Sequence, residues 1–131
     1  MTEMQDPMEI YRASLDAIPV IAEERPPVIE RAEVLPYPDL IRLWARVQVS
    51  HFSRHPDLAF RVVDPDGQTV CTLYMVEIRE PYQSITLHLR QPPRPDARYR
   101  LEIELIRDEE TLDGRTLEFD LTYREPKAQQ A

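Results

Sequence analysis

The sequence predicts an all-β protein, an antiparallel β-sandwich of about seven strands with a short N-terminal helix before it. Short runs of apolar residues alternate with polar ones, which is the period of a strand that buries one face. Turn-forming residues recur about every ten positions, as they do in sandwiches and barrels. The chain has 131 residues, a length that suits one domain with its own hydrophobic core.

Three parts are expected along the chain: an N-terminal helix and linker (1–25), the β-sandwich domain (26–125) and a C-terminal tail (126–131). The helix is predicted to begin at Asp6, which can cap it, with Pro7 as its first residue, and to end before Pro19. Its apolar residues are three or four positions apart and form one stripe, made of Met4, Met8, Tyr11, Leu15 and Ile18. Because so short a helix is marginal alone in water, the stripe is expected to dock, either on its own domain or on its copy in a dimer.

The first two strands are predicted on either side of Pro36-Tyr37-Pro38. Residues 28–35 have the character of an edge strand, because their two faces do not separate cleanly into apolar and polar. Residues 41–49 form a clearer strand, since all the odd positions are apolar. This alternation places Trp44 on the outer face, between Arg42 and Arg46.

The middle of the chain predicts three more strands. Leu58, Phe60 and Val62 form the inward side of the third, which ends at a turn over residues 64–67. The run 69–78 is apolar on both faces, so we expect it either to be covered on both sides or to cross between sheets. The fifth strand has its inward side at alternate positions, at Ile85, Leu87 and Leu89.

The last two strands show the cleanest alternation of apolar and polar residues, over 99–105 and 117–123. Asp113-Gly114 lies between them, and such a dipeptide tolerates the positive φ angles of a hairpin tip. We therefore expect an antiparallel hairpin with its tip at Asp113-Gly114.

The stretch from Pro93 to Leu105 resembles the tyrosine corner of immunoglobulin-like domains, because a proline-containing loop leads into Tyr99 at the start of the penultimate strand. The opening Pro26-Pro27-Val28-Ile29 is similar to that of many bacterial immunoglobulin-like modules. The resemblance implies an immunoglobulin-like sandwich in which Tyr99 is structural, buried and bonded through its hydroxyl to a backbone group within residues 93–97. Cys71 is the only cysteine, so the disulfide of antibody domains is missing.

Composition argues against several classes of function. The formal net charge of −8 at pH 7 argues against nucleic acid as a partner, because binding phosphates needs a surplus of Lys and Arg. The first twenty residues contain acids and no long apolar core, and no stretch approaches about 18 apolar residues, so neither a signal peptide nor a membrane span is expected. A single cysteine gives no sign of an oxidising compartment, and the expected location is cytoplasmic.

No motif for catalysis, metal binding or a cofactor stands out. His51 and His55 are four residues apart, but Pro56 follows, so a helix that would bring both onto one face is not expected. Calcium loops space their acids at alternate positions around a glycine, unlike the acidic stretch of Asp108, Glu109, Glu110 and Asp113. The chain has two glycines, too few for a glycine-rich phosphate loop. The sequence therefore predicts no enzyme, no metal site and no cofactor.

The predicted function is a noncatalytic module for protein–protein contact, as an accessory subunit, an adaptor or a self-associating homodimer. Strand edges and the apolar helix stripe are its visible means of interaction. The alternative is a module that binds carbohydrate or another small ligand through outward aromatic side chains around Trp44. The residues expected to make these contacts are Trp44, Tyr74, Tyr82, Met8, Tyr11, Leu15 and Ile18.

Overall fold

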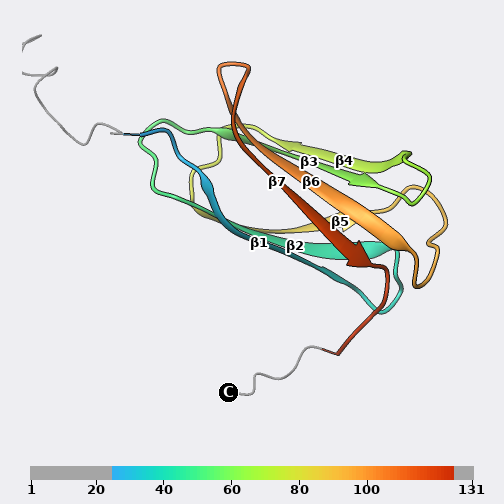
Figure 1. Ribbon diagram of the computed structural model, residues 1–131. Helices are drawn as coiled ribbons and strands as arrows, with labels where there is room; N and C mark the ends of the chain where they lie inside the picture. The colour runs from blue at the N-terminus through green and yellow to red at the C-terminus, as the bar shows by residue number, and fades with distance from the viewer. Residues whose placement is uncertain (1–24, 126–131) are drawn as a thin grey trace, which may run out of the picture.

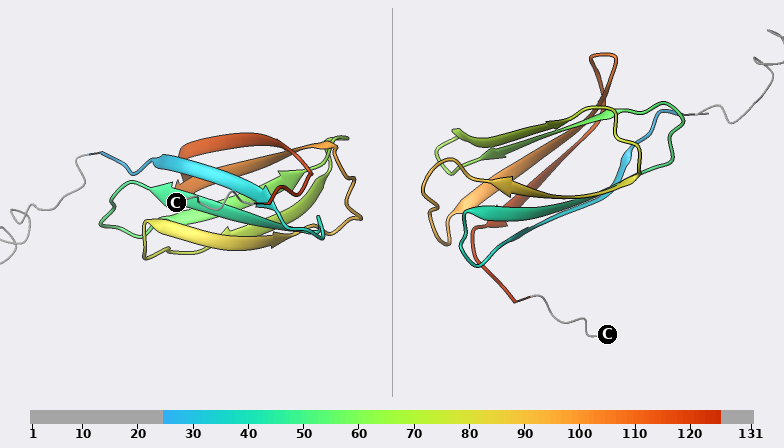
Figure 2. Two further views of the ribbon diagram at one scale, coloured as in Figure 1. Left: turned by 90° about the horizontal axis from the view of Figure 1, so that it is seen from below. Right: turned by 180° about the vertical axis from the view of Figure 1, so that it is seen from behind.

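The computed structural model describes residues 25–125, which form two antiparallel sheets packed face to face (Figures 1 and 2). The strands are β1 (Ile29–Pro36), β2 (Arg42–Val49), β3 (Asp57–Val63), β4 (Thr69–Met75), β5 (Tyr82–His88), β6 (Arg98–Arg107) and β7 (Glu110–Asp120). The predicted fold class, an antiparallel sandwich of seven strands, is confirmed for this part of the chain. The expected N-terminal helix and its stripe, with Met8, Tyr11, Leu15 and Ile18, lie outside the described residues.

The three-stranded sheet has the order β1-β2-β5, and the four-stranded sheet has the order β4-β3-β6-β7. In an immunoglobulin constant domain the fourth strand pairs with the fifth, whereas here β4 pairs with β3. The other six strands are divided between the sheets as in that domain.

Within residues 25–125 there is no helix long and apolar enough to cross a membrane.

The core lies between the sheets and is built by the alternation within each strand. On β2, for example, every second residue is buried against the other sheet, from Leu43 to Val49. Seven leucine and isoleucine side chains are less than 2% exposed and fill the middle of the sandwich: Leu43, Leu58, Leu87, Leu101, Ile103, Leu105 and Leu121. Burial of each contributes about 1.5–3 kcal/mol, so the hydrophobic effect of this layer holds the two sheets together.

Tyr99 forms the corner at which the chain enters β6. It is 3% exposed, and its hydroxyl accepts a hydrogen bond from the backbone N–H of Arg94 at 3.0 Å. Its ring stacks on Phe119 of β7, its cross-strand neighbour, with ring centroids 6.0 Å apart. The bond to Arg94 falls within the range 93–97 that the sequence predicted.

The two sides of the sandwich are closed differently. On the side where β1 meets β7, the Asp113 carboxylate accepts a hydrogen bond from the Ile29 N–H at 2.8 Å. The Arg115 guanidinium donates to the Ile29 carbonyl, so both backbone groups of one residue are tied to the other sheet. We call this the β1–β7 side. On the opposite side, called the β4–β5 side, the Arg90 N–H donates to the Val70 carbonyl at 2.8 Å.

The predicted tip of the last hairpin is wrong. The turn lies at Asp108-Glu109, where φ is +53° and +66°, while Asp113 and Gly114 lie within β7 and pair with β6. A two-residue turn at Asp113-Gly114 would have placed Phe119 opposite Asp108. The actual register instead places Phe119 opposite Tyr99, so burial of the apolar faces decided the register against the local turn preference. β7 accordingly ends at Asp120 rather than at Tyr123.

The expectation for the run 69–78 is also wrong. β4 ends at Met75, and it neither crosses between sheets nor is covered on both faces. Val70 and Cys71 are buried, but Leu73, Tyr74 and Val76 are 36%, 54% and 66% exposed. The reason is that Tyr74 lies opposite Ala59 and faces the outer side of the sheet, while Leu73 lies opposite the buried Phe60 but on an edge strand.

Candidate interaction site on the three-stranded sheet

The side chains considered for catalysis or metal binding in the sequence are not brought together into a site by the fold. His51 and His55 are exposed on the loop after β2, and His55 contacts Phe52 edge-on. Cys71 is buried, and burial raises the pKa of its thiol, which disfavours the nucleophilic thiolate. Asp108 forms an ion pair with Arg54 at 2.8 Å. Among residues 25–125, no group of three or more His, Cys, Asp or Glu side chains is placed to hold a metal ion.

The outward side of β1-β2-β5 gathers aromatic, arginine and hydroxyl side chains. The register places Glu33, Arg46 and Ser84 in one row across the three strands, with Leu35, Trp44 and Thr86 in the next row. We call this surface the Trp44 face and define it as Arg31, Glu33, Leu35, Arg42, Trp44, Arg46, Gln48, Tyr82, Ser84 and Thr86. The alternation that buries Leu43 and Ala45 is what turns Trp44 and the arginines outward.

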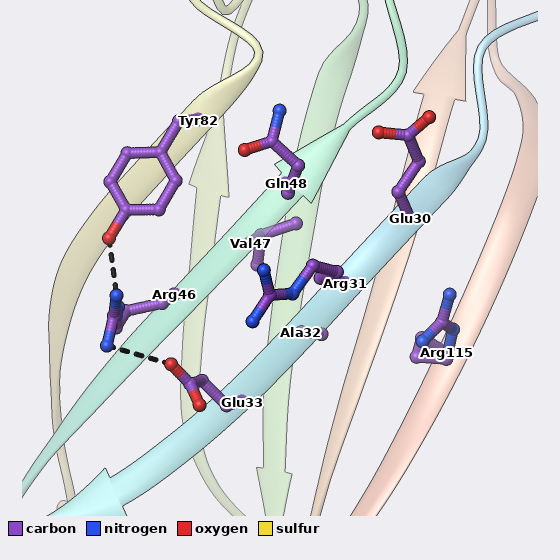
Figure 3. A pocket seen from close by; sticks show the side chains of 9 residues that line it. All are labelled: Glu30, Arg31, Ala32, Glu33, Arg46, Val47, Gln48, Tyr82 and Arg115. Carbon is purple, nitrogen blue, oxygen red and sulfur yellow. Dashed lines mark hydrogen bonds and ion pairs between the residues drawn. The ribbon is translucent and has the colours of Figure 1, made fainter.

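Arg46 is held by partners from all three strands of this sheet. Its Nε donates to the Tyr82 hydroxyl at 2.9 Å, and its Nη1 lies 2.8 Å from a Glu33 carboxylate oxygen. Figure 3 shows Tyr82, Arg46 and Glu33 in sequence across β5, β2 and β1. The bond to Tyr82 is the main reason why the pKa of Arg46 is raised above its ordinary value. The guanidinium is therefore fixed in place and fully charged.

Trp44 is also fixed in orientation. Its indole N–H donates to the Ser84 hydroxyl at 2.7 Å, and the Arg46 guanidinium lies over its ring, 4.8 Å from the centroid. The cation–π contact and the hydrogen bond together keep the ring against the sheet. A face of the indole is thus occupied by a side chain of the protein itself.

Two hollows border this cluster. The first has a volume of about 330 Å³ and a largely charged lining, in which Arg31, Arg46 and Arg115 outnumber Glu30 and Glu33 (Figure 3).

The second hollow, of about 360 Å³, is lined by aromatic, proline and leucine side chains with one arginine: Leu35, Pro36, Tyr37, Pro38, Trp44, Tyr123 and Arg124. Arg42 lies 4.5 Å from the Tyr37 ring centroid and is paired with Asp39 at 2.9 Å. A guanidinium pocket suits a carboxylate, and an aromatic cleft suits an apolar side chain.

The predicted contact residues do not all share one surface. Trp44 and Tyr82 lie together on the Trp44 face, whereas Tyr74 lies on the outer side of the other sheet, on β4. The sequence placed Arg46 beside Trp44 on the outer face, but it did not indicate Ser84 as a partner of Trp44 or Glu33 as a partner of Arg46. The alternation within β2 is enough to place Arg46 on the face of Trp44, but Glu33 and Ser84 lie on the two neighbouring strands, whose register had to be known first.

Tyr74 has its own hydrogen bond, since its hydroxyl donates to the Asp57 carboxylate at 2.8 Å. This bond stabilises the neutral phenol and raises the pKa of Tyr74 above the ordinary tyrosine value. We expect the Tyr74 ring to ionise at a higher pH in the wild-type protein than in the Asp57→Asn variant, as followed by NMR of ring-labelled tyrosine. The Tyr74→Phe variant identifies the resonance. Identical midpoints in the two proteins would show that the bond to Asp57 does not form in solution.

Comparisons with known proteins give a fold but no family. No protein-family model matches the chain, and no curated protein matches it either. A β-glucuronidase from Ruminococcus gnavus is similar in structure, with a TM-score of 0.54, 14% identity and a match over 73% of this chain and 16% of that one. A glycosyl hydrolase family 2 member from Bacteroides cellulosilyticus matches with a TM-score of 0.54 and 15% identity, over 72% of this chain and 14% of that one. The match thus spans 16% and 14% of the length of these two chains.

Proposed function

We propose that the chain is a noncatalytic β-sandwich module that contacts another protein through the Trp44 face. The observation that carries the proposal is the ordering of Arg46 by Trp44, Tyr82 and Glu33 on an outward sheet surface. Trp, Tyr and Arg are the residue types that dominate binding energy at protein interfaces. Because these side chains are already ordered, a partner would meet them at a smaller cost in side-chain entropy.

The neighbouring hollows support the same proposal. The charged hollow beside Arg31 fits an acidic side chain of a partner, and the apolar cleft beside Tyr37 fits a hydrophobic one. Specific protein interfaces usually have aromatic residues at their centre and polar residues around them. The structurally similar sandwiches form a small part of much longer enzymes, which favours the role of an accessory unit over that of a complete enzyme.

Carbohydrate binding is the second candidate, and the apolar cleft beside Trp44 is the observation that favours it. Tyr37, Trp44 and Tyr123 line this cleft, and aromatic rings are suited to stacking on sugar rings. Against it, Arg46 already covers a face of the indole, and Ser84 already binds the indole N–H. A sugar that stacked on the indole face covered by Arg46 would have to displace Arg46 from three partners, so protein contact is preferred.

The test places a photo-crosslinking amino acid at Thr86, an exposed position of the Trp44 face, and irradiates cells of the source organism. The matched control places it at Thr116, an exposed threonine on the outer side of the other sheet. We expect one specific protein adduct from position 86 and none from 116. Arg46→Ala should reduce that adduct at least about tenfold, because a central interface residue contributes about 2 kcal/mol or more. Arg98→Ala, which removes an arginine paired with Asp120 on the other sheet, should leave it unchanged.

Equal adducts from both positions, or none from position 86, would contradict the proposal.

Trp44 is the only tryptophan, so its fluorescence reports on this face alone and tests the alternative, carbohydrate binding, directly. A saturable change of this fluorescence on titration with glycans, lost in Tyr37→Ala, would establish carbohydrate binding in its place.

A further inference from the structure

The edge strands of the two sheets differ in how well they are protected against pairing with another chain. This property is separate from the Trp44 face. On the β1–β7 side, β1 carries Glu30, Arg31 and Glu33 and ends at Pro36, and Ile29 is bonded to two side chains of β7. Charges and proline on an edge strand are the usual means of preventing it from pairing with another chain. β1 is therefore both tied down and unsuited to accept a further strand.

β4 has no charged residue and no proline, and only its start is tied to the other sheet, through the Val70 carbonyl. The stretch 69–76, with sequence TVCTLYMV, contains no charged residue, no proline and no glycine, and it is rich in residues of high β-propensity. Its side chains are also unusually exposed for their type, since Leu73, Tyr74 and Val76 are 36%, 54% and 66% accessible. An edge strand of this composition is a template for pairing with an additional strand.

The part of β4 that is open to pairing with another strand, which we call the window, has a limit at each end. At its start, the Val70 carbonyl accepts from Arg90, so the end of β5 covers the first part of β4. At its end, Glu77 has a φ of +49°, and its N–H donates to Asp57, which turns the chain away from the strand direction. The window therefore comprises residues 72–76. The Tyr74 hydroxyl is bonded to Asp57 on β3, which keeps the ring over the sheet and off the edge.

We infer that this window pairs with the same window of a second copy of the chain, in an antiparallel arrangement about a two-fold axis. In such a pairing the central residue lies opposite itself, and any charged side chain there would meet its own like charge. A window without charge is free of this repulsion. Pairing centred on Tyr74 uses all of residues 72–76 and joins the two four-stranded sheets into one continuous sheet across the dimer.

The register that follows is specific. Tyr74 lies opposite Tyr74 of the second copy, Leu73 lies opposite Met75, and Thr72 lies opposite Val76. Aromatic pairs and aliphatic pairs are favourable cross-strand neighbours. Because the window is only five residues long, the contact is smaller than a standard interface, so the dimer is weak and depends on protein concentration.

The experiment is sedimentation velocity on the full chain over a wide range of concentrations, with two matched variants. Tyr74→Lys places two lysines opposite each other at the centre of the pairing, and we expect it to abolish the dimer. Tyr82→Lys changes a tyrosine of similar exposure on the Trp44 face, 45% against 54%, and we expect it to leave the dimer intact. Thermal melts of both variants check that each remains folded. Because Tyr74 lies outside the core, its replacement should leave a cooperative transition.

A cysteine trap tests the register itself. In a Cys71→Ala background, Tyr74→Cys should form a disulfide-linked dimer on mild oxidation, because directly opposite Cβ atoms in an antiparallel pair lie about 4.5–5.5 Å apart. Tyr82→Cys in the same background should not. A wild-type chain that is monomeric at every concentration would overturn the inference. A dimer that survives Tyr74→Lys would also overturn the inference. This includes a dimer that is lost instead on Tyr82→Lys or on removal of residues 1–24.

Discussion

Tyr99→Ala is expected to lower the free energy of unfolding by about 3–5 kcal/mol, the range typical of removing a buried aromatic ring. The ring is 3% exposed and stacks on Phe119, so its removal leaves a cavity beside Phe119 on the inner face of the sheet, which the close-packed neighbours cannot readily fill. The lost hydrogen bond to the Arg94 N–H adds to this effect. Urea denaturation followed by circular dichroism measures the change.

Tyr99→Phe separates the two contributions. It keeps the ring and removes only the hydroxyl, so the Arg94 N–H loses its acceptor, and we expect a loss of about 1–2 kcal/mol. Tyr123→Phe is the matched control, because Tyr123 is 42% exposed and its replacement should change stability by less than about 0.5 kcal/mol. If Tyr99→Phe were as stable as the wild type, the corner would be held by ring packing alone.

Asp113→Ala is expected to lower the free energy of unfolding by about 1–3 kcal/mol, the cost of leaving a partly buried donor without an acceptor. One oxygen of this carboxylate accepts from the Ile29 N–H and the other accepts from the Gly114 N–H. Asp113→Asn retains one acceptor oxygen and should lose less. Amide hydrogen exchange at Ile29 should accelerate in Asp113→Ala, because the Ile29 N–H loses its acceptor.

Asp120→Ala is the control for this prediction. Asp120 lies on the same strand and forms an exposed ion pair with Arg98, which contributes about 0–1 kcal/mol. Equal losses in Asp113→Ala and Asp120→Ala, with unchanged exchange at Ile29, would mean that the β1–β7 side is not closed by the Asp113 bond.

Much of the fold was predictable because the strands with one buried face carry their own signal. The alternation in β2 and β6 reports burial directly, and the structure buries the predicted sides of both, except that Ile41 precedes β2 and is 42% exposed. The hairpin tip was not predictable in this way. Asp113-Gly114 is the stronger local turn signal, but matching Tyr99 with Phe119 and Leu101 with Leu117 required a turn five residues earlier. The register of a hairpin depends on how the side chains of both strands pack together. The turn preference of a dipeptide carries no information about that packing.

The same limit explains what was predicted of the candidate site. The outward position of Trp44 followed from its own strand, but the order of Glu33, Arg46 and Tyr82 across three strands follows only from their pairing. Tyr74 was expected to join the aromatic residues around Trp44. The sheet to which β4 belongs decides this, and β4 pairs with β3 rather than β5, which places Tyr74 on the other outer surface.

The attachment of Ile29 to β7 has a kinetic consequence for the protein. Its two hydrogen bonds join residues 84 and 86 positions apart in the chain, so they close very long loops. Contacts of such long range slow folding, and all-β domains dominated by them fold in about milliseconds to seconds. The β1-β2 and β6-β7 hairpins each need only a short connection and can form early, whereas the two bonds between Ile29 and β7 can form only after the two sheets have met. The contacts of Ile29 with β7 are therefore expected to be among the last to form during folding.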